Sequence, residues 1–194
     1  MVAQGESNLI LVFNEMLSFD AAAKRYIALD DEASITISSD LANIKPTNAG
    51  IDRNAPALKT EKIISEDWEW SIVDVIRGDD AWKMVQEANQ YNDPPAEGFE
   101  YIAIKIHVRY IGTEDGGASI DGLFFRTTGS ANILHDAPSV VDPSPQLDIW
   151  LYPGGEYEGW VVVQASQGET NMVLIFEPFL DIFGTNTRYV SLEQ

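Results

Sequence analysis

Three cationic or titratable side chains stand at alternate positions of one segment: Lys105, His107 and Arg109. If that segment is a β-strand, alternate side chains share a face, and the three groups lie side by side. Such a row could bind an anion or a carboxylate ligand, with His107 tuning the site near neutral pH. Alternatively, each cation pairs with an acidic residue on a neighbouring strand, where a single pair contributes little to stability. We favour the pairing and keep the row as the candidate ligand site.

Carboxylates in two loops are candidates for calcium, which takes roughly six to eight oxygen ligands. One set comprises Glu114, Asp115 and Asp121, and the other lies at residues 30–32. Neither set has the alternating acidic pattern of a dedicated calcium loop. Because a chain with 31 acidic residues brings some of them together by accident, a solvated acidic surface is the competing interpretation.

Signatures of catalysis are missing from the sequence. The chain has no cysteine and only two histidines, so a Ser-His-Asp site would have to use His107 or His135. No nucleophile-elbow pattern and no glycine-rich phosphate loop is present. A carboxylate pair of the glycosidase type stays open, but nothing points to one. We therefore expect no enzyme, no catalytic residues and, calcium aside, no cofactor.

Two further motifs have structural explanations. Arg77-Gly78-Asp79 matches the tripeptide of integrin ligands, but Asp79 or Asp80 stands where the N-cap of a helix belongs. The tryptophans could form a platform that stacks on sugars. Since most of them fall in patterned segments, we expect core positions instead. They are Trp68, Trp70, Trp82, Trp150 and Trp160.

The charge of the chain restricts its partners. With 31 acidic and 12 basic side chains the net charge is −19, which disfavours binding to nucleic acid and direct insertion into anionic membranes. No apolar run approaches the roughly 20 residues of a membrane helix. The absence of cysteine is compatible with an extracellular location. Met1–Ser7 lacks the basic start of a signal peptide, so we expect any export signal to lie outside this chain.

The end of the chain repeats its beginning. Residues 168–194 align with residues 5–31 without a gap, at an offset of 163 residues. Each copy contains two β-prone runs, Leu9–Phe13 with Arg25–Leu29 and Met172–Phe176 with Arg188–Leu192. We therefore expect the two copies to adopt the same structure. The identical pairs are Gly5/Gly168, Glu6/Glu169, Asn8/Asn171, Leu11/Leu174, Phe13/Phe176, Leu17/Leu180, Arg25/Arg188, Tyr26/Tyr189 and Leu29/Leu192.

This repeat suggests how the chain is divided. Residues 1–31 are interpreted as a partial copy, the closing hairpin of a preceding repeat, and residues 32–60 as a linker with a short strand at 34–38. Residues 61–194 then form one complete domain. Because an isolated hairpin is at best marginally stable in water, we expect residues 1–31 to pack on a domain edge or to exchange with a neighbour. Fraying is the remaining alternative.

The complete domain has the pattern of an all-β protein. Residues 99–110 alternate apolar and polar side chains, as a half-buried strand does. Six further short strands are expected at 119–127, 131–135, 146–151, 157–164, 171–177 and 187–192, and an earlier one begins at Trp68. The one expected helix lies near residues 79–91, ended by Pro94-Pro95. Short strands between frequent turns predict a two-sheet β-sandwich.

Two blocks carry a resemblance to a known group. The first runs from Arg77 through Asn89-Gln90-Tyr91-Asn92 to Pro94-Pro95-Ala96-Glu97-Gly98-Phe99, and the second is Leu151-Tyr152-Pro153-Gly154-Gly155-Glu156 with Gly159-Trp160. They resemble telokin-like, immunoglobulin-fold domains of unknown function in bacterial lipoproteins and secreted proteins, over about residues 60–194. The resemblance implies an immunoglobulin-like sandwich with an inserted helix outside the cytoplasm. It transfers no catalytic residue.

These observations favour a non-catalytic, extracellular or cell-surface module for structure or protein interaction. Its expected partner is another protein or a second copy of itself, through strand pairing or exchange of residues 1–31. The alternative is a domain that binds a small ligand or calcium.

Overall fold

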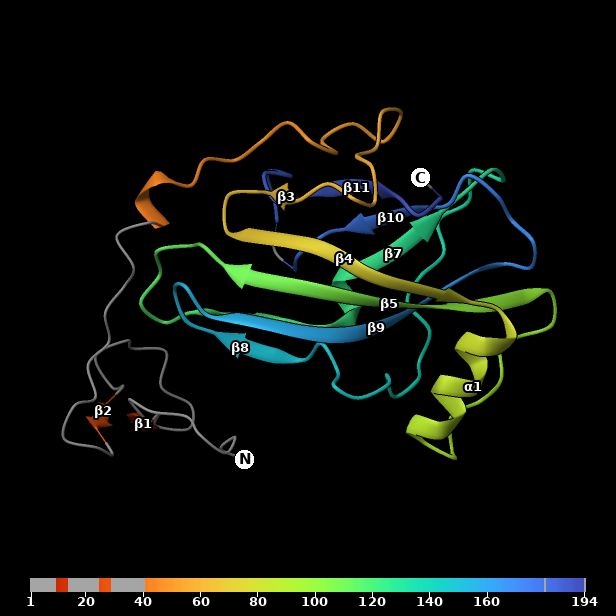
Figure 1. The fold of residues 1–194 in the computed structure, drawn as a ribbon, viewed down its shortest axis with the longest axis horizontal. Coiled ribbons are helices and arrows are strands. Elements are labelled where there is room, and N and C mark those ends of the chain that lie inside the picture. The colour runs from red at the N-terminus through yellow and green to blue at the C-terminus, as the bar shows by residue number, and fades with distance from the viewer. Residues whose placement is uncertain (1–9, 14–24, 29–40, 180, 194) are drawn as a thin grey trace. The chain divides into compact units, whose positions relative to one another are not determined.

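The computed structural model describes residues 10–13, 25–28, 41–179 and 181–193, and it separates into the units Met1–Ser39 and Asp40–Gln194. In the first unit, β1 (Ile10–Phe13) and β2 (Arg25–Ala28) form an antiparallel hairpin. The expected strand at residues 34–38 lies outside the described residues. The second unit holds all the other described elements (Figure 1).

One layer of the second unit is a four-stranded antiparallel sheet with the order β3-β4-β5-β9. Its long strands cross the middle of Figure 1; they are β4 (Trp68–Arg77), β5 (Phe99–Tyr110) and β9 (Glu156–Ser166). The fourth strand, β3 (Ile63–Ile64), has only two residues. The expected strand at 99–110 is confirmed. It is half-buried from Lys105 onward, whereas residues 101–104 are buried on both faces because residues 79–88 cover the outer one.

The other layer is built from shorter strands. A three-stranded sheet has the order β11-β10-β7, and a separate antiparallel pair joins β6 and β8. The expected strand at 131–135 is only an isolated bridge between Thr127 and His135. The elements are β6 (Ala118–Ile120), β7 (Phe125–Thr128), β8 (Ile149–Leu151), β10 (Val173–Phe176) and β11 (Arg188–Ser191), with short 3₁₀ turns η2 (Leu41–Asn43) and η3 (Gly122–Phe124).

The core lies between these layers. Ile104 and Ile106 of β5 point into it and are fully buried. The ring of Trp70 on β4 lies 6.1 Å from that of Phe125 on β7 and 5.4 Å from that of Phe176 on β10, measured between centroids. Aromatic rings from both layers thus meet in one apolar core. The expected all-β, two-sheet sandwich with one inserted helix is confirmed.

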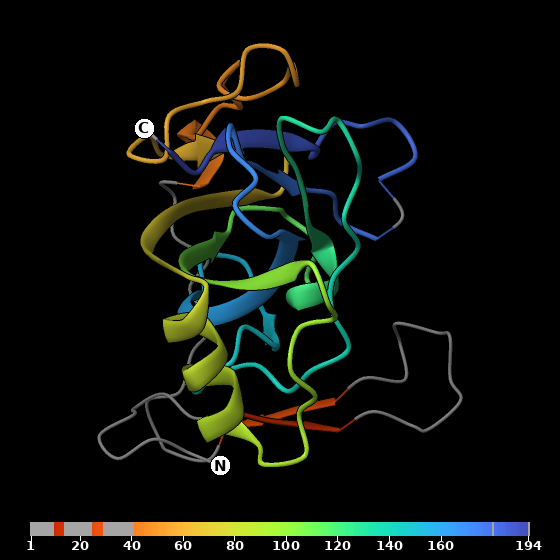
Figure 2. The same cartoon turned by 90° about the vertical axis from the view of Figure 1, so that its right-hand side faces the viewer.

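The outer face of the four-stranded sheet carries the helix α1 (Asp79–Ala88), which lies where β4 ends and β5 begins (Figures 1 and 2). Ala81 and Val85 of α1 are fully buried against Tyr101, Ala103 and Val162 of the sheet. Among the described residues no helix is long and apolar enough to span a bilayer.

The expected capping of α1 is wrong. The N-cap is Gly78, with a φ of 70°, and no side chain caps the helix. Asp79 and Asp80 occupy the first turn instead, where their negative charge interacts favourably with the helix dipole. The main chain turns sharply from β4 into α1, and only glycine adopts that backbone conformation without strain.

Residues 41–57, part of the segment that the sequence assigns to a linker, bond to both layers. The Thr47 N–H donates to Ile64 of β3, and residues 50–57 lie along β11. The Ala57 N–H donates to Tyr189, and the Ser191 N–H donates to Ala57, so this segment covers the edge of β11. The Tyr189 N–H donates to Gly50. An edge strand covered in this way is not open to further pairing.

Candidate functional site

The hairpin of β10 and β11, here called the closing hairpin (residues 173–191), completes the second layer by pairing with β7. Leu174, Phe176 and Val190 are 0%, 0% and 1% exposed. The rings of Phe176 and Phe125 lie 5.2 Å apart. The closing hairpin therefore supplies part of the core. We call the surface that it covers, formed by β7 and by Trp70, the seat of the hairpin.

A buried ion pair fixes the segment that leads into the closing hairpin. Nε2 of His135 lies 2.8 Å from Oε2 of Glu169, and the two residues are 5% and 7% exposed. The Ala131 N–H donates to Oε1 of Glu169 at 3.0 Å, and the Ser130 N–H donates to the Thr170 carbonyl at 2.8 Å. Burial opposes the charge of Glu169, but the hydrogen bonds from the Ala131 and Ser166 N–H groups and the contact with His135 outweigh it and lower the pKa of its carboxyl.

The sequence does not reveal this ion pair. His135 stands out there only as a possible catalytic base, and no local pattern pairs it with Glu169. The two residues are 34 positions apart and meet only because the sandwich closes. One signal was available, since Glu169 is among the residues that are identical between the two copies of the repeat.

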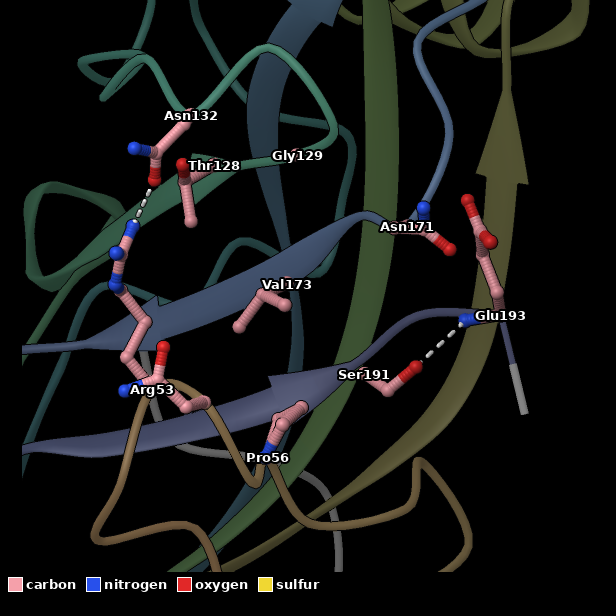
Figure 3. Close-up of a pocket in the computed structure, with 10 residues that line it drawn as sticks. Arg53, Pro56, Thr128, Gly129, Asn132, Asn171, Val173, Ser191 and Glu193 are labelled. Carbon is pink, nitrogen blue, oxygen red and sulfur yellow. Dashed lines mark hydrogen bonds between the residues drawn. The ribbon is translucent and has the colours of Figure 1, made fainter.

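A hollow of about 580 Å³ lies where the closing hairpin meets its surroundings (Figure 3). Arg53 donates a hydrogen bond to Asn132 across one side of it. Asn132 and Asn171 have positive φ values of 59° and 54°, a conformation that asparagine tolerates better than most residues. Figure 3 shows polar side chains from three segments. They are Arg53, then Thr128 at the end of β7 and Asn132 after it, and Asn171, Ser191 and Glu193 around the closing hairpin.

The hairpin of β1 and β2 repeats the closing hairpin in register as well as in sequence. Ile10 faces Ala28 and Phe13 faces Arg25 in the first unit. At an offset of 163 residues, Val173 faces Ser191 and Phe176 faces Arg188. All four paired positions match, so the two copies share one local structure over their described residues.

The surroundings of the two hairpins differ. Leu11 and Ile27, which face one another, are 50% and 54% exposed. Their counterparts Leu174 and Val190 face one another at 0% and 1% exposure. The hairpin of β1 and β2 therefore carries a half-exposed apolar pair at the positions that are buried in the closing hairpin.

The residues shared by the two copies are those that dock the closing hairpin. Glu169 forms the ion pair, Leu174 and Phe176 fill the core, and Asn171 adopts the positive φ. Arg188, 3% exposed, donates to the carbonyls of Thr185 and Thr187 at 2.9 and 2.8 Å. In the first copy the same residue types recur as Glu6, Asn8, Leu11, Phe13 and Arg25, of which Glu6 and Asn8 lie outside the described residues.

The predicted row of Lys105, His107 and Arg109 lies on the outer face of β5, beyond the part that α1 covers. Nζ of Lys105 lies 2.6 Å from Glu158 on β9. His107 and Arg109 share Glu156, at 3.4 and 3.5 Å. Each member thus stands beside a carboxylate, as the pairing interpretation expects. An anion that bound to this row would have to compete with the carboxylates of Glu156 and Glu158. The ligand site therefore stays a prediction.

The predicted calcium ligands do not form a cluster. Glu114 lines a hollow beside Trp68, whereas Asp121 lines a different one beside Asp142. The Asp121 side chain accepts the Leu123 N–H at 2.8 Å and caps η3. Among the described residues no three His, Cys, Asp or Glu side chains are placed to hold a metal ion. The second set, at residues 30–32, lies outside the described residues.

We expect the same melting temperature in 1 mM calcium and in excess chelator at matched ionic strength, because the described carboxylates offer no shared site. Differential scanning calorimetry makes the comparison. A calcium-dependent rise of several degrees, which binding to the folded state would cause, would establish the calcium site instead. Magnesium at the same concentration serves as the control for general screening of the acidic surface.

No known protein family matches the sequence, and no curated protein matches it. Solved structures are similar at low sequence identity. They include the protein YcdA of Bacillus subtilis, assigned as a lipoprotein, with a TM-score of 0.47 and 12% identity over 68% of this chain and 38% of that protein. The secreted protein MPT63 of Mycobacterium tuberculosis matches with a TM-score of 0.45 and 7% identity, over 71% of this chain and 95% of that one.

An uncharacterized β-sandwich protein of Clostridium difficile has a TM-score of 0.43 and 13% identity over 77% of this chain and 97% of its own. The present chain thus corresponds to well under half of YcdA but to nearly all of the other two. At identities of 7–13%, these likenesses concern the fold alone.

Proposed function

We propose that this chain is a non-catalytic, extracellular interaction module whose hairpin of β1 and β2 closes the sandwich of a second unit of the same kind. The observation that supports this proposal is the contrast between the two hairpins. They have the same register, yet the apolar pair Leu11 and Ile27 is half exposed while Leu174 and Val190 are buried. The placement outside the cytoplasm follows from the sequence resemblance.

The chemistry of the first copy specifies its acceptor. Leu11 and Phe13 need an aromatic seat like that of Trp70 and Phe125, and the register requires a free strand edge like that of β7. Burying a leucine and an isoleucine side chain contributes about 1.5–3 kcal/mol each. Glu6 would need a buried cationic or donor partner, as Glu169 has in His135. A sandwich of the same sequence type offers all of these together.

The closing hairpin of the acceptor competes for the same seat. In a tandem array the first copy would close the preceding unit, and in separate chains it would have to displace β10 and β11. If the first hairpin of each chain displaces the closing hairpin of the next chain, the contacts are head-to-tail. Such contacts build open chains rather than closed dimers. Weakening the closing hairpin should therefore promote assembly.

A disulfide trap tests this arrangement, since the chain has no native cysteine. Arg126 of β7 faces Ile175 of β10, and Val12 is the counterpart of Ile175. With Val12→Cys and Arg126→Cys in a Leu174→Ala background, we expect disulfide-linked ladders of two or more chains after oxidation at high protein concentration. Non-reducing electrophoresis and light scattering measure them.

Two controls define the outcome. Ile175→Cys with Arg126→Cys should give a cross-link within one chain, which shows that the geometry accepts a disulfide. Adding Leu11→Asp to the trap should abolish the ladders, because a charge cannot enter the apolar seat. Ladders that persist with Leu11→Asp, or no ladders at any protein concentration while the control pair cross-links, would overturn the proposal.

A further inference from the structure

A second hollow, of about 510 Å³, lies at the end of the sandwich where β4 begins and β5 ends. We call it the aromatic hollow. The rings of Trp68 and Tyr110 lie behind it in the core, with centroids 5.0 Å apart at an angle of 56°, and the two residues are only 3% and 2% exposed. The aromatic surface open to a ligand comes from Trp150, Phe179 and Phe183, which are 54%, 81% and 90% exposed. The aromatic side chains that line it are Trp68, Tyr110, Phe124, Trp150, Phe179 and Phe183.

The polar lining of the aromatic hollow is acidic. Asp67, Glu114 and Asp181 contribute carboxylates, and no lysine, arginine or histidine is among the described residues that line it. Burial raises the pKa of Tyr110, and the nearby charges of Asp67 and Glu114 raise it further. The net charge of −19 strengthens the attraction of cations at long range.

The loop beside the aromatic hollow holds exposed aromatic side chains in a fixed position. The carboxylate of Asp181 accepts the backbone N–H groups of Thr185, Asn186 and Thr187 at 2.8–3.0 Å. Nδ2 of Asn186 donates to Asp67 at 2.8 Å, which ties the loop to the start of β4. Phe179, Ile182 and Phe183 are nevertheless 81%, 81% and 90% exposed. Large apolar side chains that are exposed together are characteristic of a binding surface, whereas a single one is not.

From these observations we infer that the aromatic hollow binds an organic ammonium group. The faces of tryptophan, tyrosine and phenylalanine rings attract a cation within about 6 Å, and this attraction strengthens as the cation loses water. The carboxylates of Asp67 and Glu114 add a favourable field without a basic residue to compete. The site is independent of β1 and β2, so it goes beyond the proposed hairpin exchange. A free quaternary ammonium compound and the side chain of a lysine in a peptide present the same chemistry.

Choline and its uncharged isostere 3,3-dimethylbutan-1-ol test the charge requirement directly. Titrations of the full chain are followed by the indole N–H resonances of Trp68 and Trp150. We expect choline to shift them with a Kd in the millimolar range and the isostere to bind at least tenfold more weakly. A lysine peptide and its Nζ-acetylated form provide the second pair. If only the peptide binds, the natural source is a protein side chain.

Two exposed positions test the location without disturbing the core. Phe183→Ala and Glu114→Gln should each weaken choline binding about threefold to tenfold. Tyr91→Ala, at another exposed aromatic that does not line the aromatic hollow, should leave it unchanged. Equal binding of choline and its isostere, no binding by any of the cationic probes, or unchanged affinity in Phe183→Ala would overturn the inference.

Discussion

Leu174→Ala should lower the free energy of unfolding of the second unit by about 3 kcal/mol, because it removes a fully buried side chain from β10. The cavity would lie beside Phe176 and the seat of the closing hairpin. Leu174 pairs with Val190 of β11 on one side and with Thr127 of β7 on the other. Urea unfolding followed by tryptophan fluorescence measures the change. Trp70 reports on this part of the core, since its ring lies 5.4 Å from that of Phe176.

The matched control is Leu11→Ala, at the same position of the first copy. Leu11 is 50% exposed, and a substitution at such a site changes stability by no more than about 0.5 kcal/mol. Both variants are measured at low micromolar concentration, where exchange between chains does not contribute. Equal losses in the two variants would mean that Leu11 is buried in solution as Leu174 is, and would contradict the difference between the two hairpins.

The strands of the closing hairpin could be predicted from the sequence because two independent signals agree. Alternating apolar residues mark Leu174 and Phe176, and the repeat places the same pattern at Leu11 and Phe13. The observed strands lie within one residue of the expected ones. For the longest strand, alternation alone was enough, since one face of β5 enters the core and the other does not.

Other features depend on contacts that no local pattern records. His135 and Glu169 meet only in the closed sandwich. Residues 41–57 look like a linker because their hydrogen bonds either close local turns, as from Ala55 to Asp52, or reach a distant strand, as from Ala57 to Tyr189 of β11. Trp150 was expected in the core and is 54% exposed. The acidic and aromatic residues of the aromatic hollow come from four separate stretches of the chain, so their meeting could not be predicted either.

The carboxyl group of Asp142 lies where burial disfavours its charged form. It lies in a hollow of about 360 Å³ whose lining includes Leu147 and Val162. Burial, reinforced by the charges of Asp121 and Asp148, raises its pKa from 3.8 to about 7, although the Val162 N–H donates to it at 3.1 Å. The folded protein therefore holds a proton that the unfolded chain releases near pH 4.

Because of this difference, Asp142 should lower the free energy of unfolding as the pH rises. Below pH 4 the group is protonated in both states and costs nothing, and between about pH 4 and 7 the free energy of unfolding falls as the unfolded chain ionises first. At about 1.4 kcal/mol for each pKa unit, the full cost above pH 7 is about 4–5 kcal/mol. Asp142→Asn stays neutral and keeps an oxygen for the Val162 N–H, so it should stabilise the protein at pH 8 and change little at pH 4.

The measurement is the difference in free energy of unfolding between Asp142→Asn and the unmodified chain, taken by urea titration from pH 4 to pH 8. A difference that grows through this range to about 2–4 kcal/mol fits a raised pKa, because all other ionisations cancel in the comparison. Asp115→Asn, at an exposed carboxylate, should show no such growth. A constant difference for Asp142→Asn would place its effect in packing instead, and a loss of stability at pH 8 would show that the charged form is stabilised where it lies.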